Sequence, residues 1–518
     1  MKMIYRLLLI IIITGFNTLV LAQEKGLKSI SSEELKVHLE FIASDSLQGR
    51  RFGTDAPGLD IAADYLALNN KKIGLKPGCE KYFQTVDIIS SEPNKENTRL
   101  IIKNKRNEIV LETDSLIGFF KNVQKLTFRG EIVFAGFGWQ DSVSGYNDFD
   151  GLNLEDKIVI YSTGSPDSFK EEKKGKYIRY NNQLERAKWS KVMEMGAKGI
   201  ILVTSPYDKG NSNFARISSY MNRSSYSVKE KKENNIENNI VLVTSSVYDS
   251  MVGKKGALKS ELDKSLKNST SKKIIQNGFI AEVIITSDIK KMVGKNVIGI
   301  VEGSDPKLKD ECIVFTAHYD HLGIDNKGNV YNGADDNGSG TVTLLEVAEA
   351  FMALETKPKR SIVFLWVTCE EIGMLGSQYY TENPVFPLEN TVACINLDMV
   401  GRVYEKRDKV WERSPKLVRD FKGLFTLFGN ESPQLVKIND NACKKIGIKP
   451  DKSLPENFLR SSDHYSFYSK GVPIINYATG YHADYHKVSD DVSKINFKKM
   501  KKVAELCFLV GFEIANTN

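Results

Sequence analysis

Histidine and carboxylate residues gather in the second half of the chain, where most of their clusters follow short apolar runs. Four clusters are His318-Tyr-Asp320, Glu370-Glu371, Asp398 and the segment 482–486, and a fifth, Ala334-Asp-Asp-Asn-Gly-Ser-Gly340, opens a predicted helix. Ligands of open α/β sheets bind beyond the carboxyl ends of the strands. We therefore expect these side chains to converge on one spot.

The residue types in these clusters are typical of a zinc site, because imidazole nitrogen and carboxylate oxygen are common ligands of catalytic zinc. Two metal ions held close together need a shared anionic ligand, and Asp335 is the expected bridge. Glu370 and Glu371 are adjacent, so on an extended backbone their side chains point apart. One can bind metal while the other acts as a general base.

Other polar residues near these clusters have less defined roles. Asp320 lies two residues after His318 and can orient its imidazole if strand geometry persists. We expect His321 and His482 to be pocket or surface residues rather than ligands. For His464, a structural role and a place in the substrate pocket are both open.

The elements that must position these residues alternate between strand and helix. The expected strands and helices are 313–316, 341–352 (helix), 362–368, 392–397, 472–477 and 499–515 (helix). This alternation predicts an α/β fold, a three-layer α/β/α sandwich with a mixed, largely parallel sheet.

The segment before these elements has a different sequence pattern, with short β-rich runs separated by polar loops. It contains no histidine beside clustered carboxylates. The order of its segments around 130–138, 147–160 and 187–203 resembles a protease-associated (PA) domain. We expect a small β-rich PA-like insert at 114–275, which interrupts a catalytic domain made of 23–113 and 276–518.

The first 22 residues have the features of a secretory signal. Lys2 and Arg6 precede an apolar run at 7–13, and Val20-Leu21-Ala22 fits a signal-peptidase site. Polar residues interrupt the segment well before the roughly 20 apolar residues that a membrane span needs. We expect an exported protein, periplasmic or secreted, without stable membrane insertion.

The composition excludes several classes of protein. Hydrophobic residues make up 41% and charged residues 26% of the 518 residues, which is ordinary for a soluble globular protein. The net charge of +7 is mild for this length, and we expect no nucleic-acid partner. Six cysteines lack the spacing of a zinc ribbon, and their pairing is open.

Taken together, these motifs resemble the dizinc exopeptidases of metallopeptidase family twenty-eight, which include bacterial leucyl aminopeptidases, aminopeptidase Y and glutamate carboxypeptidase. The resemblance covers nearly all of the chain after residue 22. The motifs that carry it are Ala43-Ser-Asp-Ser-Leu-Gln-Gly-Arg-Arg51, His318-Tyr-Asp320, Gly333-Ala-Asp-Asp-Asn-Gly-Ser-Gly340, Glu370-Glu371, Asn396-Leu-Asp398, Ser462-Asp-His464 and Tyr485-His486.

The resemblance implies two Zn2+ ions per chain. One zinc would take His318 and Asp398. The other would take Glu371 and His486, and Asp335 would bridge the two ions.

The resemblance also implies roles for residues that do not bind metal. Glu370 would be the general base, and Asp320 would support the first histidine ligand. Tyr485 would donate a hydrogen bond to the tetrahedral intermediate. The family often shows Asp-Thr at the fourth and fifth positions after the last histidine ligand, where this chain has Asp490-Asp491, and this departure affects support of the site rather than the ligands.

The expected function is an exported zinc-dependent exopeptidase that hydrolyses peptides, an aminopeptidase in the first place. An acidic site favours a substrate amine over a carboxylate. Arg402, just after Asp398, could instead anchor a substrate carboxylate, so a carboxypeptidase is the first alternative. A mono-zinc glutaminyl cyclase and an inactive receptor-like binding protein follow, although every expected ligand and the base are present.

Overall fold

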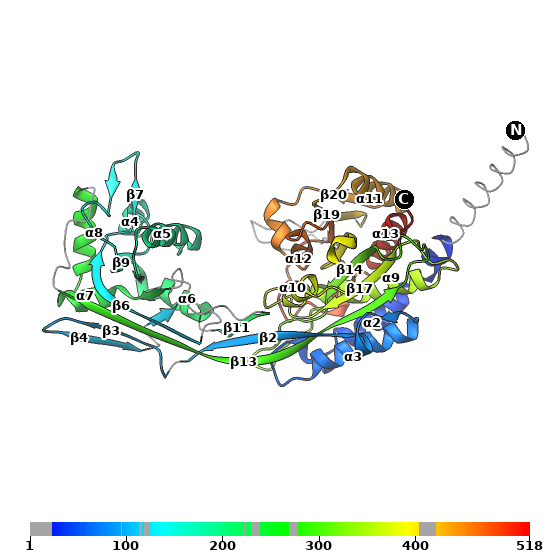
Figure 1. The fold of residues 1–518 in the computed structure, drawn as a ribbon, viewed down its shortest axis with the longest axis horizontal. Helices are drawn as coiled ribbons and strands as arrows, with labels where there is room; N and C mark the ends of the chain where they lie inside the picture. The colour runs from blue at the N-terminus through cyan, green and yellow to red at the C-terminus, as the bar shows by residue number, and fades with distance from the viewer. Residues whose placement is uncertain are drawn as a thin grey trace, which may run out of the picture. The chain divides into compact units, whose positions relative to one another are not determined.

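The computed structural model describes residues 23–94, 96–112, 116–118, 124–221, 223–228, 239–268, 278–403 and 421–517. The chain divides into two compact units, one of Met1–Ile88 with Met292–Asn518 and one of Ile89–Lys291. Figure 1 labels the elements of both units. The expected secretory signal at 1–22 lies outside the described residues.

Helices of the first unit begin and end where local sequence signals place them. α2 (Ser32–Ile42) begins after Ser31, whose hydroxyl accepts hydrogen bonds from the backbone of the first turn. α3 (Gly58–Ile73) ends at Gly74, whose φ of 87° is in the left-handed region that favours glycine. α9 (Gly340–Met352) and α13 (Phe497–Asn516) match the two helices expected near the chemistry-bearing clusters.

The central sheet of this unit has a parallel core. β17 (Ser361–Val367), β14 (Cys312–His318), β18 (Thr391–Leu397) and β21 (Ile474–Ala478) are consecutive parallel neighbours. β13 (Ile280–Val301) pairs antiparallel with β17, and β1 (Lys76–Pro77) pairs antiparallel with β13. At the other side, β19 (Gly423–Gly429) pairs antiparallel with β21 and parallel with β20 (Lys449–Asp451).

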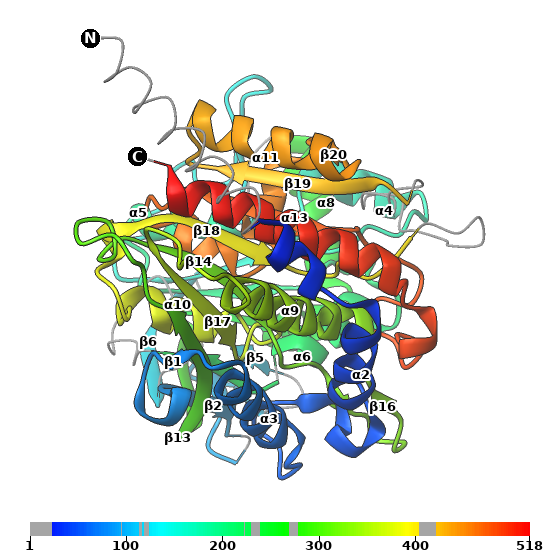
Figure 2. The same ribbon diagram turned by 90° about the vertical axis from the view of Figure 1, so that its right-hand side faces the viewer.

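Helices cover both faces of this sheet. The larger core lies between one face and α2, α3, α9, α11 (Pro433–Ile446) and α13. Figure 2 shows α9 and α13 lying across β14, β17 and β18. The opposite face packs against α10 (Leu375–Glu382) and α12 (His464–Tyr468). The prediction of a three-layer α/β/α sandwich with a mixed, largely parallel sheet is confirmed for this unit.

Two smaller sheets form most of the described strand structure of the second unit, beside a short antiparallel pair of β7 (Gln140–Asp141) and β8 (Tyr146–Asn147). In one, the first half of β13 pairs antiparallel with β3 (Arg99–Lys103) and β6 (Lys125–Phe134), and β3 pairs with β4 (Glu108–Glu112). In the other, β6, β9 (Ile158–Ser162), β10 (Gly199–Val203) and β12 (Ile240–Val243) run parallel, and β5 (Leu116–Gly118) is antiparallel to β12. The helices are α4 (Pro166–Lys173), α5 (Asn182–Glu194), α6 (Ser212–Met221), α7 (Ser245–Val252) and α8 (Ala257–Asn268).

The limits of the second unit differ from the expected insert at 114–275. The unit begins at Ile89 and ends at Lys291. The difference arises because β3, β4 and the first half of β13 pair within this unit, and β2 (Phe83–Pro93) and β13 each belong partly to both units. Its identity as a PA domain stays a prediction.

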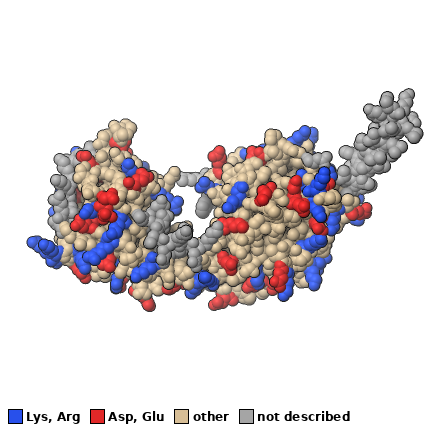
Figure 3. All heavy atoms as spheres, viewed as in Figure 1, with Lys and Arg blue, Asp and Glu red and all other residues tan. Residues whose placement is uncertain are grey.

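Within the described part of the chain, no helix combines the length and apolar character that a membrane crossing requires. The six cysteines are all free. On the face drawn in Figure 3, basic and acidic side chains are interspersed in both units.

Candidate metal centre

The candidate ligands lie at the carboxyl ends of the parallel strands, as the sequence predicts. His318 is the last residue of β14, Asp398 follows β18 directly, and Glu370 comes three residues after β17. A cavity of about 560 Å³, partly open to solvent, lies there. Its polar lining includes Asp336, Glu370, Glu371, Asp398, Tyr485 and His486.

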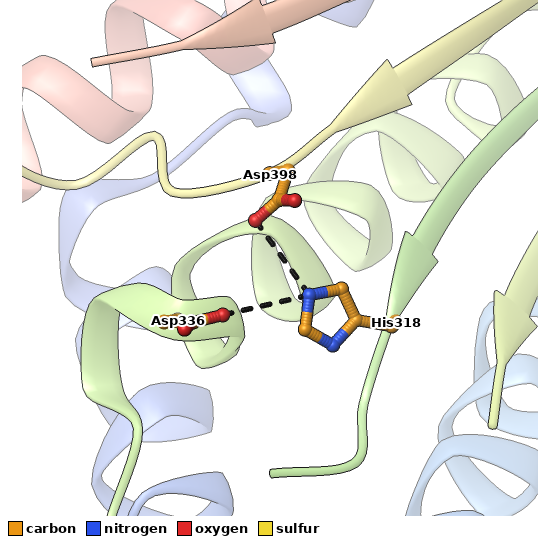
Figure 4. A group of neighbouring side chains, drawn as sticks. All are labelled: His318, Asp336 and Asp398. Carbon is orange, nitrogen blue, oxygen red and sulfur yellow. Dashed lines mark ion pairs between the residues drawn. The ribbon is translucent and has the colours of Figure 1, made fainter. Parts of the chain in front are cut away.

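His318 lies at the centre of the first group of potential ligands. Its Nε2 is 3.5 Å from Asp336 Oδ1 and 3.6 Å from Asp398 Oδ1. Figure 4 shows the imidazole facing both carboxylates. The Nδ1 atom lies 3.2 Å from the backbone oxygen of Asp320, which fixes the ring so that Nε2 points to the acidic side chains.

A second group forms around Glu371. His321 Nδ1 is 2.8 Å from Glu371 Oε1, and His486 Nε2 is 3.3 Å from Glu371 Oε2. His486 Nε2 is also 3.1 Å from Asp336 Oδ2. Asp336 therefore belongs to both groups, one carboxylate oxygen facing each.

Asp335, the expected bridge, is turned toward other partners. Its Oδ1 accepts a hydrogen bond from Gly401 N at 2.7 Å, and its Oδ2 lies 3.2 Å from His482 Nε2. The two aspartates are neighbours in the tightly turned segment Ala334–Ser339, so their side chains diverge. The long-range bond from Gly401 takes the first carboxylate, and the expectation for Asp335 is corrected to Asp336, which faces the histidines.

Asp320 organises the turn that carries the two adjacent glutamates. Its carboxylate accepts hydrogen bonds from Glu370 N at 3.0 Å and Glu371 N at 3.2 Å. The expected support of His318 comes from the Asp320 backbone oxygen, because the nearest carboxylate contact is 3.9 Å. Glu370 Oε2 lies 3.9 Å from His318 Nε2, on the pocket side of the first group.

The first group attracts protons. Burial alone would lower the pKa of His318, but the carboxylates of Glu370, Asp398 and Asp320 outweigh burial and hold the pKa well above its ordinary value. Burial raises the pKa of Glu370 well above its ordinary range despite the opposing charge of His318. A carboxylate whose pKa is raised is a stronger base than an ordinary glutamate.

The second group is held by close contacts between opposite charges. Burial alone would raise the pKa of Glu371, but the adjacent imidazoles of His321 and His486 outweigh it and lower the pKa. Burial opposes protonation of His486, yet the adjacent carboxylates of Asp336 and Glu371 raise its pKa to about 10. The carboxylates of this group therefore draw positive charge strongly.

Tyr485 lines the pocket beside the second group. Its ring stacks on His486 with centroids 3.8 Å apart, and Tyr481 packs against it at 4.6 Å. Burial and the nearby charge of Asp336 raise the pKa of Tyr485, so its phenol keeps its proton and can donate a hydrogen bond.

Arg402 does not face the pocket as an available cation. Its Nη2 donates to Asp484 Oδ2 at 2.9 Å, and its Nη1 lies 3.2 Å from His482 Nδ1. Its side chain is 5% exposed. The guanidinium thus belongs to a buried network that continues through His482 to Asp335.

Several buried nitrogen and oxygen atoms of the two groups make no hydrogen bond among the described residues, although charged groups lie close to them. They are His318 Nε2, His321 Nδ1, His321 Nε2, Asp336 Oδ2, Glu371 Oε1, Asp398 Oδ1 and His486 Nε2. Buried polar atoms are normally hydrogen-bonded, so such a cluster calls for a ligand. Imidazole nitrogens with carboxylate oxygens are the donors that zinc takes in hydrolytic sites. The donor set therefore fits zinc.

The structure also gives roles to residues that the sequence left undefined or missed. Asp490 accepts hydrogen bonds from the backbone of Asp335 and Asp336, each at 3.0 Å, and so supports the turn that presents Asp336. In the sequence, Asp490 stands where the family pattern also has Asp, and only Asp491 departs from that pattern. His464 is buried and its Nε2 donates to the backbone oxygen of Phe458, a pocket residue. Its sequence signal was the Ser-Asp-His motif.

Comparison with known proteins adds evidence independent of this geometry. Residues 296–510 match the model of "Peptidase family M28". "Aminopeptidase YwaD" of Bacillus subtilis (strain 168) is 28% identical over 226 residues, which cover 42% of this chain and 44% of that protein. "Leucine aminopeptidase 1" of Arthroderma gypseum is 30% identical over 222 residues, 40% of this chain and 55% of that protein. The matched segment thus spans about half the length of these relatives.

A solved structure resembles the whole chain. It is an aminopeptidase from Aneurinibacillus sp. strain AM-1, with a TM-score of 0.53, 17% identity, and coverage of 96% of this chain and 97% of that one. At this identity the likeness shows a shared fold. Residues 296–510 are therefore similar to peptidase family M28, and the chain shares its fold with this aminopeptidase structure.

Proposed function

We propose that this protein is a zinc-dependent aminopeptidase with two metal ions per chain. The observation that carries the proposal is the shared carboxylate of Asp336, whose two oxygens face His318 and His486 separately. Buried imidazole nitrogens and carboxylate oxygens that make no hydrogen bond lie on both sides of Asp336, and they support two adjacent cation positions. The family and the names of the relatives support peptide hydrolysis as the reaction.

The proposed ligands follow from these contacts. One zinc would be held by His318 and Asp398, and the other by Glu371 and His486. Asp336 would bridge them in place of Asp335. His321 contacts Glu371 from the buried side and would hold its carboxylate in place.

In the proposed mechanism, bound zinc would supply a Lewis acid that polarises the scissile carbonyl and lowers the pKa of the attacking water. Glu370 accepts the proton of the attacking water, for which its buried, proton-attracting environment is suited. It then passes that proton to the leaving amine. The Tyr485 hydroxyl donates a hydrogen bond to the oxyanion of the tetrahedral intermediate.

An amino terminus suits this pocket better than a carboxylate. Four carboxylates line it, and none of its described lining residues is Lys or Arg. Arg402, the residue that would favour a carboxypeptidase, is held by Asp484 and His482. These observations favour an aminopeptidase over the carboxypeptidase alternative.

The rest of the pocket supports an apolar substrate side chain. Its walls carry Met399, Phe425, Leu454, Phe458 and Tyr481. Burial of apolar surface contributes roughly 25 cal/mol per Å², so large apolar amino-terminal residues should be preferred over alanine or charged residues.

The location of the protein and the nature of its second unit are further parts of the proposal. The basic start and apolar run of the first 22 residues support export to the periplasm or medium. Amino-terminal sequencing of exported protein should then begin at Gln23, and recovery of chains that start at Met1 would oppose export. The second unit, a PA-like insert in this proposal, would not supply metal ligands.

The test of the function uses the purified chain from residue 23 onward. It should hydrolyse arylamides of leucine, methionine and phenylalanine, and the same compounds with an acetylated amine should not be cleaved. Elemental analysis should find close to two zinc ions per chain. One zinc together with cyclisation of amino-terminal glutamine would move the assignment to a glutaminyl cyclase.

A further inference from the structure

Arg50 is a buried cation outside the candidate ligand set, yet it is bonded to the segments that carry ligands. It is the last residue of the short helical segment η1 (Asp45–Arg50) and is fully buried. Its Nε donates to Tyr319 O at 2.8 Å, and its Nη1 donates to Asn332 O at 2.8 Å. Its Nη2 donates to Gly333 O at 3.2 Å.

These acceptors belong to two segments that reach the candidate metal centre. Tyr319 follows His318 directly, and Gly333 lies three residues before Asp336. The backbone of Arg50 adds a further link, because its oxygen accepts a hydrogen bond from His321 N at 3.1 Å. One residue of the amino-terminal segment therefore ties the His318–His321 segment to the turn of Asp336.

The guanidinium also places positive charge behind the acidic site. Among the described residues, no carboxylate lies within ion-pair distance of Arg50, and its remaining Nη1 bond goes to the backbone oxygen of Ile42. Burial lowers the pKa of Arg50 to about 10, and the carboxylates of Asp320, Asp490 and Asp336 oppose this shift, so the group is charged at neutral pH. A buried charge without a direct counter-ion persists only where hydrogen bonds satisfy it.

The backbone that presents Arg50 is held in an unfavourable conformation. Gln48, Gly49 and Arg50 have φ values of 50°, 68° and 49°, in the left-handed region. A Cβ at Gly49 would lie 2.4 Å from Gly323 O and 2.7 Å from Tyr331 O. Such strain in two non-glycine residues persists where the surrounding contacts require the geometry, and it is common beside functional sites.

We propose that Arg50 is a positioning residue that holds the segments carrying His318, His321 and Asp336 in their binding arrangement before metal binds. Its planar fork reaches carbonyl groups of both segments at once, which an ammonium group on a lysine stem cannot reproduce. The inference rests on the proposed function only in taking metal as the ligand of the site.

A purely structural role for Arg50 makes a different prediction. If Arg50 only stabilised the fold, its replacement would lower the melting temperature of the zinc-free and zinc-loaded protein equally. If it positions the ligands, replacement also weakens zinc binding, and the gain in melting temperature on adding zinc becomes smaller, because a bound ligand stabilises in proportion to its affinity.

The experiment compares Arg50→Lys with Arg51→Lys, an exposed neighbour whose described hydrogen bond is a long one to Leu322 O, 3.4 Å. Zinc affinity is measured by competition with a chelator, and folding by circular dichroism. We expect Arg50→Lys to bind zinc roughly 10- to 100-fold more weakly, the usual effect of losing an outer support of a metal site. Arg51→Lys should match wild type. Unchanged zinc affinity in a folded Arg50→Lys variant would overturn the proposal.

A second measurement needs only the wild-type chain and covers the case in which the variant fails to fold. Hydrogen exchange of the zinc-free protein should show protected amides in peptides covering 318–336, the amide of His321 included. Full exchange of these peptides in a zinc-free protein whose central sheet stays protected would also overturn the proposal. Neither readout depends on peptide turnover, so a protein that binds zinc without cleaving peptides would refute the proposed function and leave this test intact.

Discussion

Both units of the molecule bury charged side chains, but the two sets differ in how completely they are partnered. In the second unit, Lys188 Nζ lies 3.0 Å from Glu185 and donates to the backbone oxygens of Ser162 and Gly164. Nearby, the carboxylate of Asp148 accepts bonds from two backbone amides and a tyrosine hydroxyl. Each of these side chains has a partner within the chain: Glu185 Oε1 accepts a hydrogen bond from Gly164 N, and its Oε2, which makes no hydrogen bond, faces Lys188.

The cluster in the first unit has a different balance. Carboxylates outnumber the histidines they face, and seven nitrogen and oxygen atoms of the two groups make no hydrogen bond among the described residues. A low-dielectric interior makes unpaired charge costly, so an arrangement of this kind is stable only with a ligand or bound protons. The comparison separates a buried ion pair that serves the fold from a buried cluster that is built for a cation.

The largest expected effect concerns Glu370. Glu370→Gln keeps the size of the side chain but removes its ability to accept a proton, so kcat should fall roughly 100- to 10,000-fold. Zinc content should stay that of wild type, since Glu370 is not among the proposed ligands. Loss of zinc with retained turnover would instead require an exchange of roles with Glu371.

The second unit should respond in stability rather than in chemistry. Lys188→Met leaves Glu185 buried without its cation, and we expect a loss of about 3–5 kcal/mol in the free energy of unfolding of this unit. Thermal or urea unfolding measures it. The double variant Lys188→Met/Glu185→Gln should recover most of the loss. Zinc content and turnover of a small arylamide should not change in the folded protein, and a change in zinc content would end the distinction between the two clusters.

The neighbouring aspartates test which carboxylate faces the metals. Asp336→Asn should lower zinc occupancy below two per chain and reduce kcat/KM strongly. Asp335→Asn should keep both ions and reduce kcat/KM roughly 10- to 100-fold, because it weakens only the contacts to Gly401 and His482. The reverse order in elemental analysis would return the bridge to Asp335.

The smallest expected effect concerns a buried carboxyl outside the candidate metal centre, Glu346 on α9. Burial raises its pKa to about 8, and the like charges of Glu349 and Glu34 add to the shift, whereas an unfolded glutamate titrates at about 4.3. The folded chain therefore holds a proton that the unfolded chain has released. The stabilisation is complete below about pH 4 and is lost as the pH rises through about 8.

Glu346→Gln stays neutral at every pH and can still accept the bond that Glu346 takes from Ser31 N. Its free energy of unfolding should exceed that of wild type by about 1–3 kcal/mol at pH 9, and the difference should shrink toward pH 5. Urea unfolding across this range measures the difference. The matched control is Glu33→Gln, an exposed glutamate in the first turn of α2, the helix that Ser31 caps. A constant difference across the range would contradict the assignment.

The sequence by itself determined the layout of the first unit and the place of its chemistry. Apolar runs that end in His318, Glu370-Glu371 and Asp398 form parallel strands. Their carboxyl ends lie at the same edge of the sheet, because the strands alternate with helices along the chain. The helix cap at Ser31 and the closing helix were also predicted, because both depend on residues close together in the sequence. The antiparallel β19 and the helix α11 carried no recognised signal.

Only the tertiary structure decided which atoms face the pocket. Asp335 and Asp336 are chemically identical neighbours, and a hydrogen bond from Gly401, 66 positions away, holds the first away from His318 and His486 and leaves the second beside them. From the sequence alone, Arg402 could anchor a substrate carboxylate, but in the structure its guanidinium donates to Asp484. The sequence predicted no role for Arg50. Its acceptors include the backbone carbonyls of Tyr319, Asn332 and Gly333, which lie 269 or more positions away. Every residue has a backbone carbonyl, so no residue type indicates these contacts. Such choices depend on contacts between distant segments, which exist only once the chain has folded.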